Sequence, residues 1–274
     1  MTPQTLRVFT AFSGYDSQCL ALDRLRGENP DFDYELVGWS EIDKYAIQAH
    51  NALYPQWADR NYGDITAIDW EQVPDFDLFT YSSPCQDFSN AGLQRGGDEG
   101  SGTRSSLLWE CRRAIVAKRP KYLLLENVAN LVSKRFKPLF QKWLDELESY
   151  GYANFWQVMN VKDYGVPQNR KRVFLVSMLR QEKCTYPTYQ FPQPFPLMRR
   201  LKDVLEANVG EKFYLSSKAL AGFTQHKERH EEKGTGFIWK PKDLSKDGGG
   251  VANCLRANGS LAPTDNTILE CTNG

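Results

Sequence analysis

The order of apolar and polar residues over the first 180 positions predicts alternating strands and helices. Short apolar runs rich in β-branched and aromatic residues predict strands at residues 6–12, 35–39, 77–81, 122–126, 155–161 and 173–179. Apolar residues at three- and four-residue spacing predict helices at residues 17–25, 44–53, 105–117 and 136–147. This alternation is typical of a mostly parallel, doubly wound α/β sheet with helices on both faces. Ligands of such sheets bind at the carboxyl ends of the strands.

The pattern weakens after residue 180. Residues 187–196 contain four prolines and are interpreted as a linker, and we assign no strands beyond them. We therefore expect a first domain of residues 1–180 and a smaller second region of residues 181–274. The glycine-rich stretch of residues 86–103 is predicted to be a lid over the site rather than a helix.

The formal net charge of zero hides an asymmetry. Residues 1–159 carry 16 Lys and Arg against 22 Asp and Glu, a net charge of −6, whereas residues 160–246 carry 17 against 9, a net charge of +8. A basic second part on an acidic first part favours a surface that faces a polyanion. A solvated basic surface explains the same charge split equally well.

The cysteines and histidines do not have the spacing of a metal site. None of the six cysteines forms a Cys-x-x-Cys pair, and two of the three histidines lie in a charged stretch. We expect free thiols and no metal centre. The chain has no apolar run of the roughly 20 residues that a membrane span needs and no signal-peptide pattern, so we expect a cytoplasmic protein.

Two tripeptides, Pro84-Cys85-Gln86 and Glu126-Asn127-Val128, each follow an apolar run that is typical of a buried strand. The thiol of Cys85 and the carboxyl of Glu126 are therefore expected on adjacent loops at one edge of the sheet. A thiolate beside a proton-donating carboxyl can add to an electron-poor ring and protonate it in the same event. Partial desolvation at the end of the strand favours the protonated carboxyl. A buried structural thiol and a structural carboxyl hydrogen bond are the alternatives.

Three candidate strand ends near the N-terminus carry residues suited to a nucleoside. Phe12-Ser13-Gly14 ends the first strand, where a glycine allows a ligand to approach the backbone closely. Glu41 ends the second strand, where α/β folds hold ribose hydroxyls. Asp64, in Gly63-Asp64-Ile65, follows a third candidate strand and could meet an adenine amino group. Each acid alone is more often a helix cap or a solvated turn, but the ordered set predicts a nucleoside pocket.

The segment Gln168-Asn169-Arg170-Lys171-Arg172 is predicted to lead into the last strand. Alternation along a strand places Arg170 and Arg172 on one face and Lys171 on the other. Two planar guanidinium groups on one face suit a carbonyl oxygen and a phosphate. A basic strand edge alone is more often solvated surface.

Taken together and in order, these residues resemble the cytosine-5 DNA methyltransferases over residues 6–180. The resemblance implies a Rossmann-like class I methyltransferase domain in residues 1–180, followed by a linker and a partial target-recognition region in residues 181–274. It implies S-adenosyl-L-methionine as the cofactor, double-stranded DNA as the substrate and no metal. The catalytic residues that it implies are Cys85, Glu126, Arg170 and Arg172. The cofactor-binding residues that it implies are Phe12, Ser13, Gly14, Glu41, Ile42, Asp64, Ile65, Pro84 and Leu107. The DNA-binding residues that it implies are Gln86, Ser89 and Arg104.

The mechanism implied by the resemblance begins with a cytosine extruded from the duplex. Cys85 adds to ring carbon 6, Glu126 donates a proton to ring nitrogen 3, and Arg172 holds the 2-carbonyl oxygen. Carbon 5 then takes the methyl group. Methylation of cytosine in transfer RNA is an alternative from the same family, and a non-catalytic cofactor- or DNA-binding subunit is an alternative from another class.

The sequence departs from the family pattern at Asp16, at Ser83, where a bulkier residue often precedes Pro-Cys, and in the final motifs. The first motif usually reads Phe-x-Gly-x-Gly, and Asp16 stands at the second glycine. The family's final motifs, a Leu-x-Pro-x-Glu segment and a helix packed near the cofactor, are not found before Gly274. We therefore expect either that a second polypeptide supplies them or that the chain is a shortened product, and that apolar residues of the first helix, such as Leu20 and Leu25, are exposed in their absence.

Overall fold

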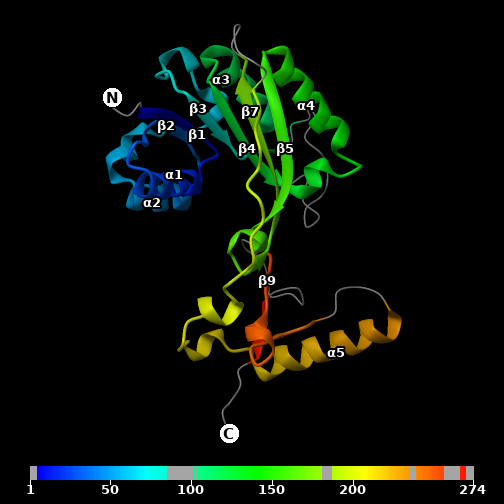
Figure 1. Cartoon of the computed structure of the whole chain (residues 1–274). Coiled ribbons are helices and arrows are strands. Elements are labelled where there is room, and N and C mark those ends of the chain that lie inside the picture. The colour runs from blue at the N-terminus through cyan, green and yellow to red at the C-terminus, as the bar shows by residue number, and fades with distance from the viewer. Residues whose placement is uncertain are drawn as a thin grey trace. The chain divides into compact units, whose positions relative to one another are not determined.

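The computed structural model describes residues 5–84, 102, 104–180, 187–234, 239–255 and 266–269 (Figure 1). The chain divides into two compact units. The first consists of Met1–Val158 and Arg172–Phe191, and the second of Met159–Lys171 and Pro192–Gly274. The chain passes between these units at positions other than residue 180. The functional division at that residue therefore stays a prediction.

The first unit is built on a six-stranded sheet with the order β2-β1-β3-β4-β7-β5. β1 pairs in parallel with β2 and β3, and β3 pairs in parallel with β4, whereas β4 and β7 are antiparallel. The predicted mostly parallel sheet is therefore confirmed. Its strands are β1 (Thr5–Ala11), β2 (Asp33–Ser40), β3 (Leu78–Tyr81), β4 (Tyr122–Val128), β5 (Tyr152–Asn160) and β7 (Lys171–Leu179).

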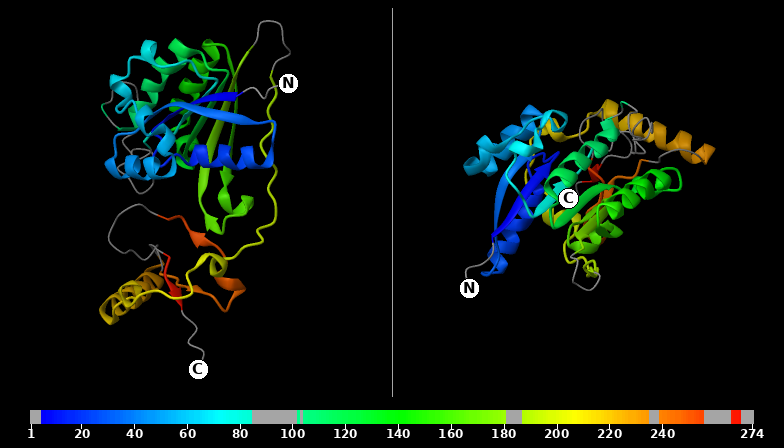
Figure 2. Two further views of the ribbon diagram at one scale, coloured as in Figure 1. Left: turned by 90° about the vertical axis from the view of Figure 1, so that its left-hand side faces the viewer. Right: turned by 90° about the horizontal axis from the view of Figure 1, so that it is seen from above.

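Helices cover both faces of this sheet, and alternation along β1 shows why. Val8 packs into a cluster with Cys19 of α1, whereas Phe9 packs into a larger cluster with residues of α3 and α4. Successive side chains of a strand point to opposite faces, so both faces are apolar and both need a cover. Figures 1 and 2 show α1 and α2 together on one side of the sheet, apart from α3 and α4. The helices are α1 (Ser17–Glu28), α2 (Lys44–Leu53), α3 (Cys111–Lys118) and α4 (Lys137–Ser149).

Three sequence expectations about local structure were wrong. Residues 105–117 do not form one helix, because a 3₁₀ segment at Arg104–Glu110 precedes α3. No third strand precedes Asp64 among the described residues. Instead a 3₁₀ turn at Pro55–Arg60 leads to a single bridge between Trp39 and Asn61. The strand expected to continue from Gln168 is interrupted at Arg170, and β6 (Gln168–Asn169) pairs with β9 in the second unit.

The second unit contains helix α5 (Ser217–Lys233) and strands of two residues each. β6 pairs in parallel with β9 (Ala252–Asn253), and β8 (Lys242–Asp243) pairs in parallel with β10 (Ile268–Leu269). Aromatic pairs supply its apolar contacts: Tyr164 packs on Phe195, and Phe223 stacks on Trp239. Two-residue strands carry no periodic signal, which is why the sequence pattern assigns none here.

Candidate active site

The loop after β1 is held in an unusual backbone conformation. Phe12, Gly14 and Asp16 have φ values of 55°, 60° and 65°, which lie in the left-handed region. The backbone N–H of Ser13 donates to the carbonyl of Ser40 at 3.2 Å, which ties this loop to the end of β2. Non-glycine residues in this region persist only where the surroundings hold them, and such positions cluster at ligand sites.

Glu41 links the ends of β1 and β2. Its Oε2 accepts a hydrogen bond from the N–H of Gly14 at 2.9 Å, and its Oε1 accepts from the N–H groups of Ile42 and Asp43 at 2.8 Å each. A carboxylate held by three backbone donors is fixed in one orientation. Phe12-Ser13-Gly14 and Glu41 therefore lie together, as the sequence predicted for a nucleoside pocket, although their binding role stays a prediction.

The other residues expected around the nucleoside have mixed surroundings. The Ile42 side chain is 70% exposed, so an apolar face is open to solvent beside Glu41. Asp64 is exposed and caps a 3₁₀ turn through the N–H of Thr66 at 2.9 Å. The Ile65 side chain is buried in the core of the first unit, and that of Phe12 packs partly against the same core.

Glu126 and Arg172 form an ion pair at the ends of β4 and β7. The distance between Arg172 Nε and Glu126 Oε1 is 2.9 Å, and the two side chains are 15% and 30% exposed. The antiparallel register pairs Val128 with Arg172, which places the arginine two residues beyond Glu126 on the neighbouring strand. A guanidinium at this distance holds the carboxyl group of Glu126 in one orientation.

The segment that leads to Cys85 is fixed by a residue of the second tripeptide. The amide of Asn127 is buried and donates to the carbonyl of Ser83 at 3.1 Å and to its hydroxyl at 3.3 Å. Ser83 is also buried, and Pro84 follows it. The ends of β3 and β4 are therefore joined side by side, and the position of Cys85 relative to Glu126 stays a prediction.

Several predicted site residues lie outside the described residues. Cys85, Gln86 and Ser89 belong to this group, as does most of the predicted lid. Arg104 and Leu107 both lie in the 3₁₀ segment Arg104–Glu110.

Arg170 lies in the second unit, whereas Arg172 lies in the first. The backbone N–H of Arg170 donates to Oδ1 of Asn160 at 3.0 Å, and Nη1 of Arg170 lies 3.5 Å from the sulfur of Cys254. The expectation that Arg170 and Arg172 alternate on one continuous strand was wrong, because the strand breaks between β6 and β7.

The described cysteines other than Cys254 are poorly suited to nucleophilic chemistry. Cys19 and Cys111 are buried, and burial raises the pKa of each thiol well above its ordinary value. A thiol that stays protonated is a weak nucleophile. In the parts of the chain that the structure describes, no group of three or more His, Cys, Asp or Glu could hold a metal ion. No helix among the described residues is long and apolar enough to cross a membrane.

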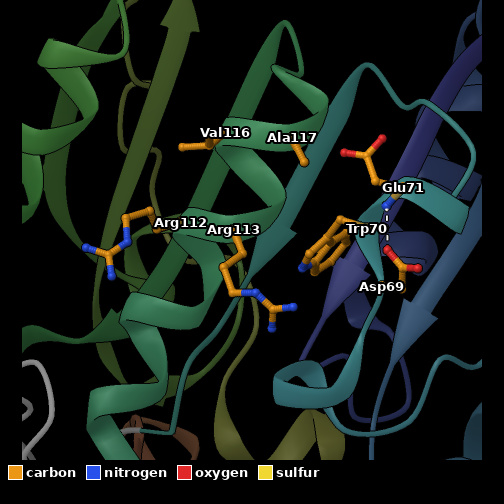
Figure 3. A pocket seen from close by; sticks show the side chains of 7 residues that line it. All are labelled: Asp69, Trp70, Glu71, Arg112, Arg113, Val116 and Ala117. Atoms are coloured by element: carbon orange, nitrogen blue, oxygen red, sulfur yellow. Dashed lines mark hydrogen bonds between the residues drawn. The ribbon is translucent and has the colours of Figure 1, made fainter.

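A hollow of about 480 Å³ lies away from these strand ends, between α3 and the 3₁₀ turn Trp70–Gln72 (Figure 3). The two arginines that line this hollow, Arg112 and Arg113, already bind groups of the protein itself. Arg112 pairs with Glu146 at 3.2 Å, and Arg113 donates to the carbonyls of Thr66 and Ile68. These contacts indicate that the two arginines have a structural role between the helix and the turn.

Comparison with known proteins places the chain in a family. The sequence profile of the C-5 cytosine-specific DNA methylases matches residues 6–273. The chain belongs to this family. It is 40% identical to the type II methyltransferase M2.ScrFI of Lactococcus lactis subsp. cremoris, over 77% of this chain and 71% of that protein. It is 36% identical to M.NlaX of Neisseria lactamica, over 78% of this chain and 66% of that protein, so the chain spans about two thirds of these relatives.

The fold of this DNA methylase family member is also that of solved methyltransferases. The crystal structure of the S. pombe Dnmt2 methyltransferase matches with a TM-score of 0.62 and 16% identity, covering 87% of this chain and 67% of that one. At this identity the likeness concerns the fold alone.

Sequence reasoning missed two asparagines that hold the site of this methylase together. Asn127 fixes the segment before Cys85, and its place inside the second tripeptide was the available signal. Asn61 accepts from the N–H groups of Glu41 and Gly63 and donates to the carbonyl of Glu41. Nothing in the local pattern marks Asn61, because it acts on a strand end 20 residues away.

Proposed function

We propose that this chain transfers a methyl group from S-adenosyl-L-methionine to carbon 5 of cytosine in double-stranded DNA, with Cys85 as the nucleophile. Membership of the DNA methylase family supports the reaction class. The observation that carries the assignment to this chain's residues is the ion pair between Glu126 and Arg172, because it brings an acid and a planar cation to the end of β4, beside the segment that leads to Cys85.

The pair matches the polar edge of a cytosine. The guanidinium of Arg172 can donate to the 2-carbonyl oxygen, and the carboxyl of Glu126 can reach ring nitrogen 3. When the base draws the guanidinium toward its carbonyl, the carboxyl loses part of the charge that favours its ionised form and becomes a better proton donor.

The addition step then has residues of this chain to carry it. The Cys85 thiolate forms a bond to carbon 6 while Glu126 gives its proton to nitrogen 3, so no net negative charge builds up on the ring. The electron pair at carbon 5 would take the methyl group, with S-adenosyl-L-homocysteine as the leaving group. Loss of the carbon 5 proton to a base, breakage of the carbon–sulfur bond to Cys85 and return of the nitrogen 3 proton to Glu126 then restore the aromatic ring.

The loop of residues 12–16 and Glu41 suit the nucleoside part of the cofactor. Glu41 is oriented by three backbone donors and can accept from ribose hydroxyls, and the exposed Ile42 offers an apolar face to an adenine. The cofactor supplies an activated methyl group when it is bound. We propose that Asp64, at a capped turn, completes the polar side of this pocket.

The decisive experiment offers the full chain DNA that carries 5-fluorocytosine, because fluorine at carbon 5 cannot leave as a proton and the adduct is trapped. We expect a covalent adduct that depends on S-adenosyl-L-methionine and is lost in Cys85→Ala. An adduct that persists in Cys85→Ala would remove Cys85 from this role. Transfer RNA with the same modified base serves as the second substrate, and trapping on it alone would favour the transfer RNA reaction.

We also propose a second polypeptide as a partner, and a cellular location for the reaction. Leu20 and Leu25 of α1 are 37% and 42% exposed, which supports a second polypeptide that covers this face of the helix. Higher methylation after such a polypeptide is added, compared with the chain alone, is the expected result, and unchanged methylation contradicts it. We place the reaction in the cytoplasm of a bacterial or phage-infected cell, where DNA is accessible.

A further inference from the structure

A buried carboxylate lies beneath the loop that follows β1. The Asp16 side chain is fully buried at the start of α1. One carboxylate oxygen, Oδ2, accepts from the hydroxyl of Thr10 at 2.7 Å, and the other accepts from the N–H of Cys19 at 3.3 Å. Both donors are neutral groups. A buried carboxylate usually needs a cationic partner as well, because burial removes the water that stabilises its charge.

His50 of α2 is the candidate cation. Its side chain is also fully buried, and its ring stacks on Trp39 with a centroid separation of 3.7 Å. Its Nδ1 lies 3.4 Å from Oδ1 of Asn51. Its Nε2 makes no hydrogen bond among the described residues and lies 3.7 Å from Oδ2 of Asp16. A proton on Nε2 would give each buried group the partner that it needs.

We propose that Asp16 and His50 form a buried charge pair that holds the loop of residues 12–16 in its cofactor-binding shape, an inference that rests on the proposed function. Asp16 ends the loop that presents Gly14. His50 packs on Trp39, two residues before Glu41. The pair therefore links the same two segments that the Gly14–Glu41 hydrogen bond joins. His50 is thus a positioning residue for the cofactor.

A simpler explanation of Asp16 makes the opposite prediction. Asp16 stands where the family pattern usually has glycine, and aspartate tolerates the left-handed region better than most residues. If the backbone conformation were all that matters, Asp16→Gly would bind cofactor as well as the wild type or better, because glycine adopts a φ of 65° without steric cost. The charge pair predicts weaker binding, because Asp16→Gly leaves the buried imidazole without a counter-charge.

The test measures the Kd of S-adenosylhomocysteine by calorimetry for the full chain and its Asp16→Gly, His50→Gln and double variants. We expect each single variant to bind roughly tenfold more weakly, and the double variant to lose about the same factor rather than about a hundredfold. Asp23→Asn is the matched control. Asp23 lies in the same helix and accepts from the hydroxyl of Tyr34 at 2.9 Å, so this variant should leave the Kd unchanged. Circular dichroism establishes that every variant is folded at the temperature used.

A pH profile separates the charge pair from mere packing. The charge of the pair depends on a proton on the imidazole, so the wild-type Kd should rise as the pH is raised, and the His50→Gln Kd should change less with pH. Among the neighbours of the pair, burial raises the pKa of Cys19, Tyr34 and Tyr54 above their ordinary values, so these groups stay neutral.

The outcomes distinguish this inference from the proposed function. A wild type that binds no S-adenosylhomocysteine overturns both. A wild type that binds overturns the inference alone if Asp16→Gly binds equally well, if the double variant loses the product of the two single factors, or if the wild-type and His50→Gln pH profiles coincide.

Discussion

Replacing Glu126 by glutamine separates proton donation from binding. The neutral amide keeps the shape of the side chain but cannot give a proton to ring nitrogen 3. Positioned proton transfer contributes about 100- to 10,000-fold to a rate, which corresponds to about 3–5.5 kcal/mol of activation free energy. We therefore expect the single-turnover methylation rate to fall by that factor. The DNA Kd should change by no more than about threefold, or ~0.7 kcal/mol.

The same substitution also tests the ion pair as a structural contact. Glu126 and Arg172 are 2.9 Å apart and mostly buried, so removal of one charge should lower the free energy of unfolding by about 1–2 kcal/mol. For a domain of this size that is a fall in melting temperature of about 2–8 °C, measurable by scanning calorimetry. The loss leaves the protein folded at the temperature of the rate assay.

Glu35→Gln is the matched control for this experiment. Glu35 pairs with Arg60 at 2.7 Å, a similarly short contact, but it lies in the first half of β2, away from the carboxyl ends of the strands. It is 46% exposed, so its removal should cost at most about 1 kcal/mol and leave the methylation rate unchanged. Equal losses of rate and DNA affinity in Glu126→Gln, or a rate within tenfold of the wild type, would refute proton donation by Glu126.

Three further predictions address the cofactor, the core and the DNA. Glu41→Ala should weaken binding of S-adenosylhomocysteine by about tenfold or more in calorimetry, since it removes the acceptor of three backbone N–H groups, and an unchanged Kd would exclude Glu41 from the site. Gly38→Ala should lower the free energy of unfolding by about 1–3 kcal/mol, because the added Cβ would lie 2.7 Å from a ring carbon of Phe9. Gly27→Ala, with nothing within 4 Å of its added Cβ, should show no such loss in the same denaturant titration. DNA binding should weaken steeply with salt, with crosslinks concentrated in residues 160–246, and crosslinks mainly to residues 1–60 would contradict this.

The sequence determined the elements whose signals are local. The helix predicted at residues 44–53 is α2 with the same bounds, because its apolar periodicity coincides with an N-cap: Asp43 accepts from the N–H groups of Tyr45 and Ala46. The strands of the first unit are long enough to show burial in their residue types. Where the signal was mixed, the prediction failed, as in the 3₁₀ segment before α3. Where the segments were too short to give a signal, no prediction was made, as for the two-residue strands of the second unit.

The tertiary structure decided which polar side chains meet. Glu126 and Arg172 are 46 positions apart and pair because β7 runs antiparallel beside β4, a strand order that periodicity does not encode. Asp16 and His50 are separated by a helix and a strand and meet only when α1 and α2 pack on the same face of the sheet. Periodicity reports how much of a segment is buried, which is a local property. The partner of a buried polar group depends on strand order and register, which the whole chain fixes together.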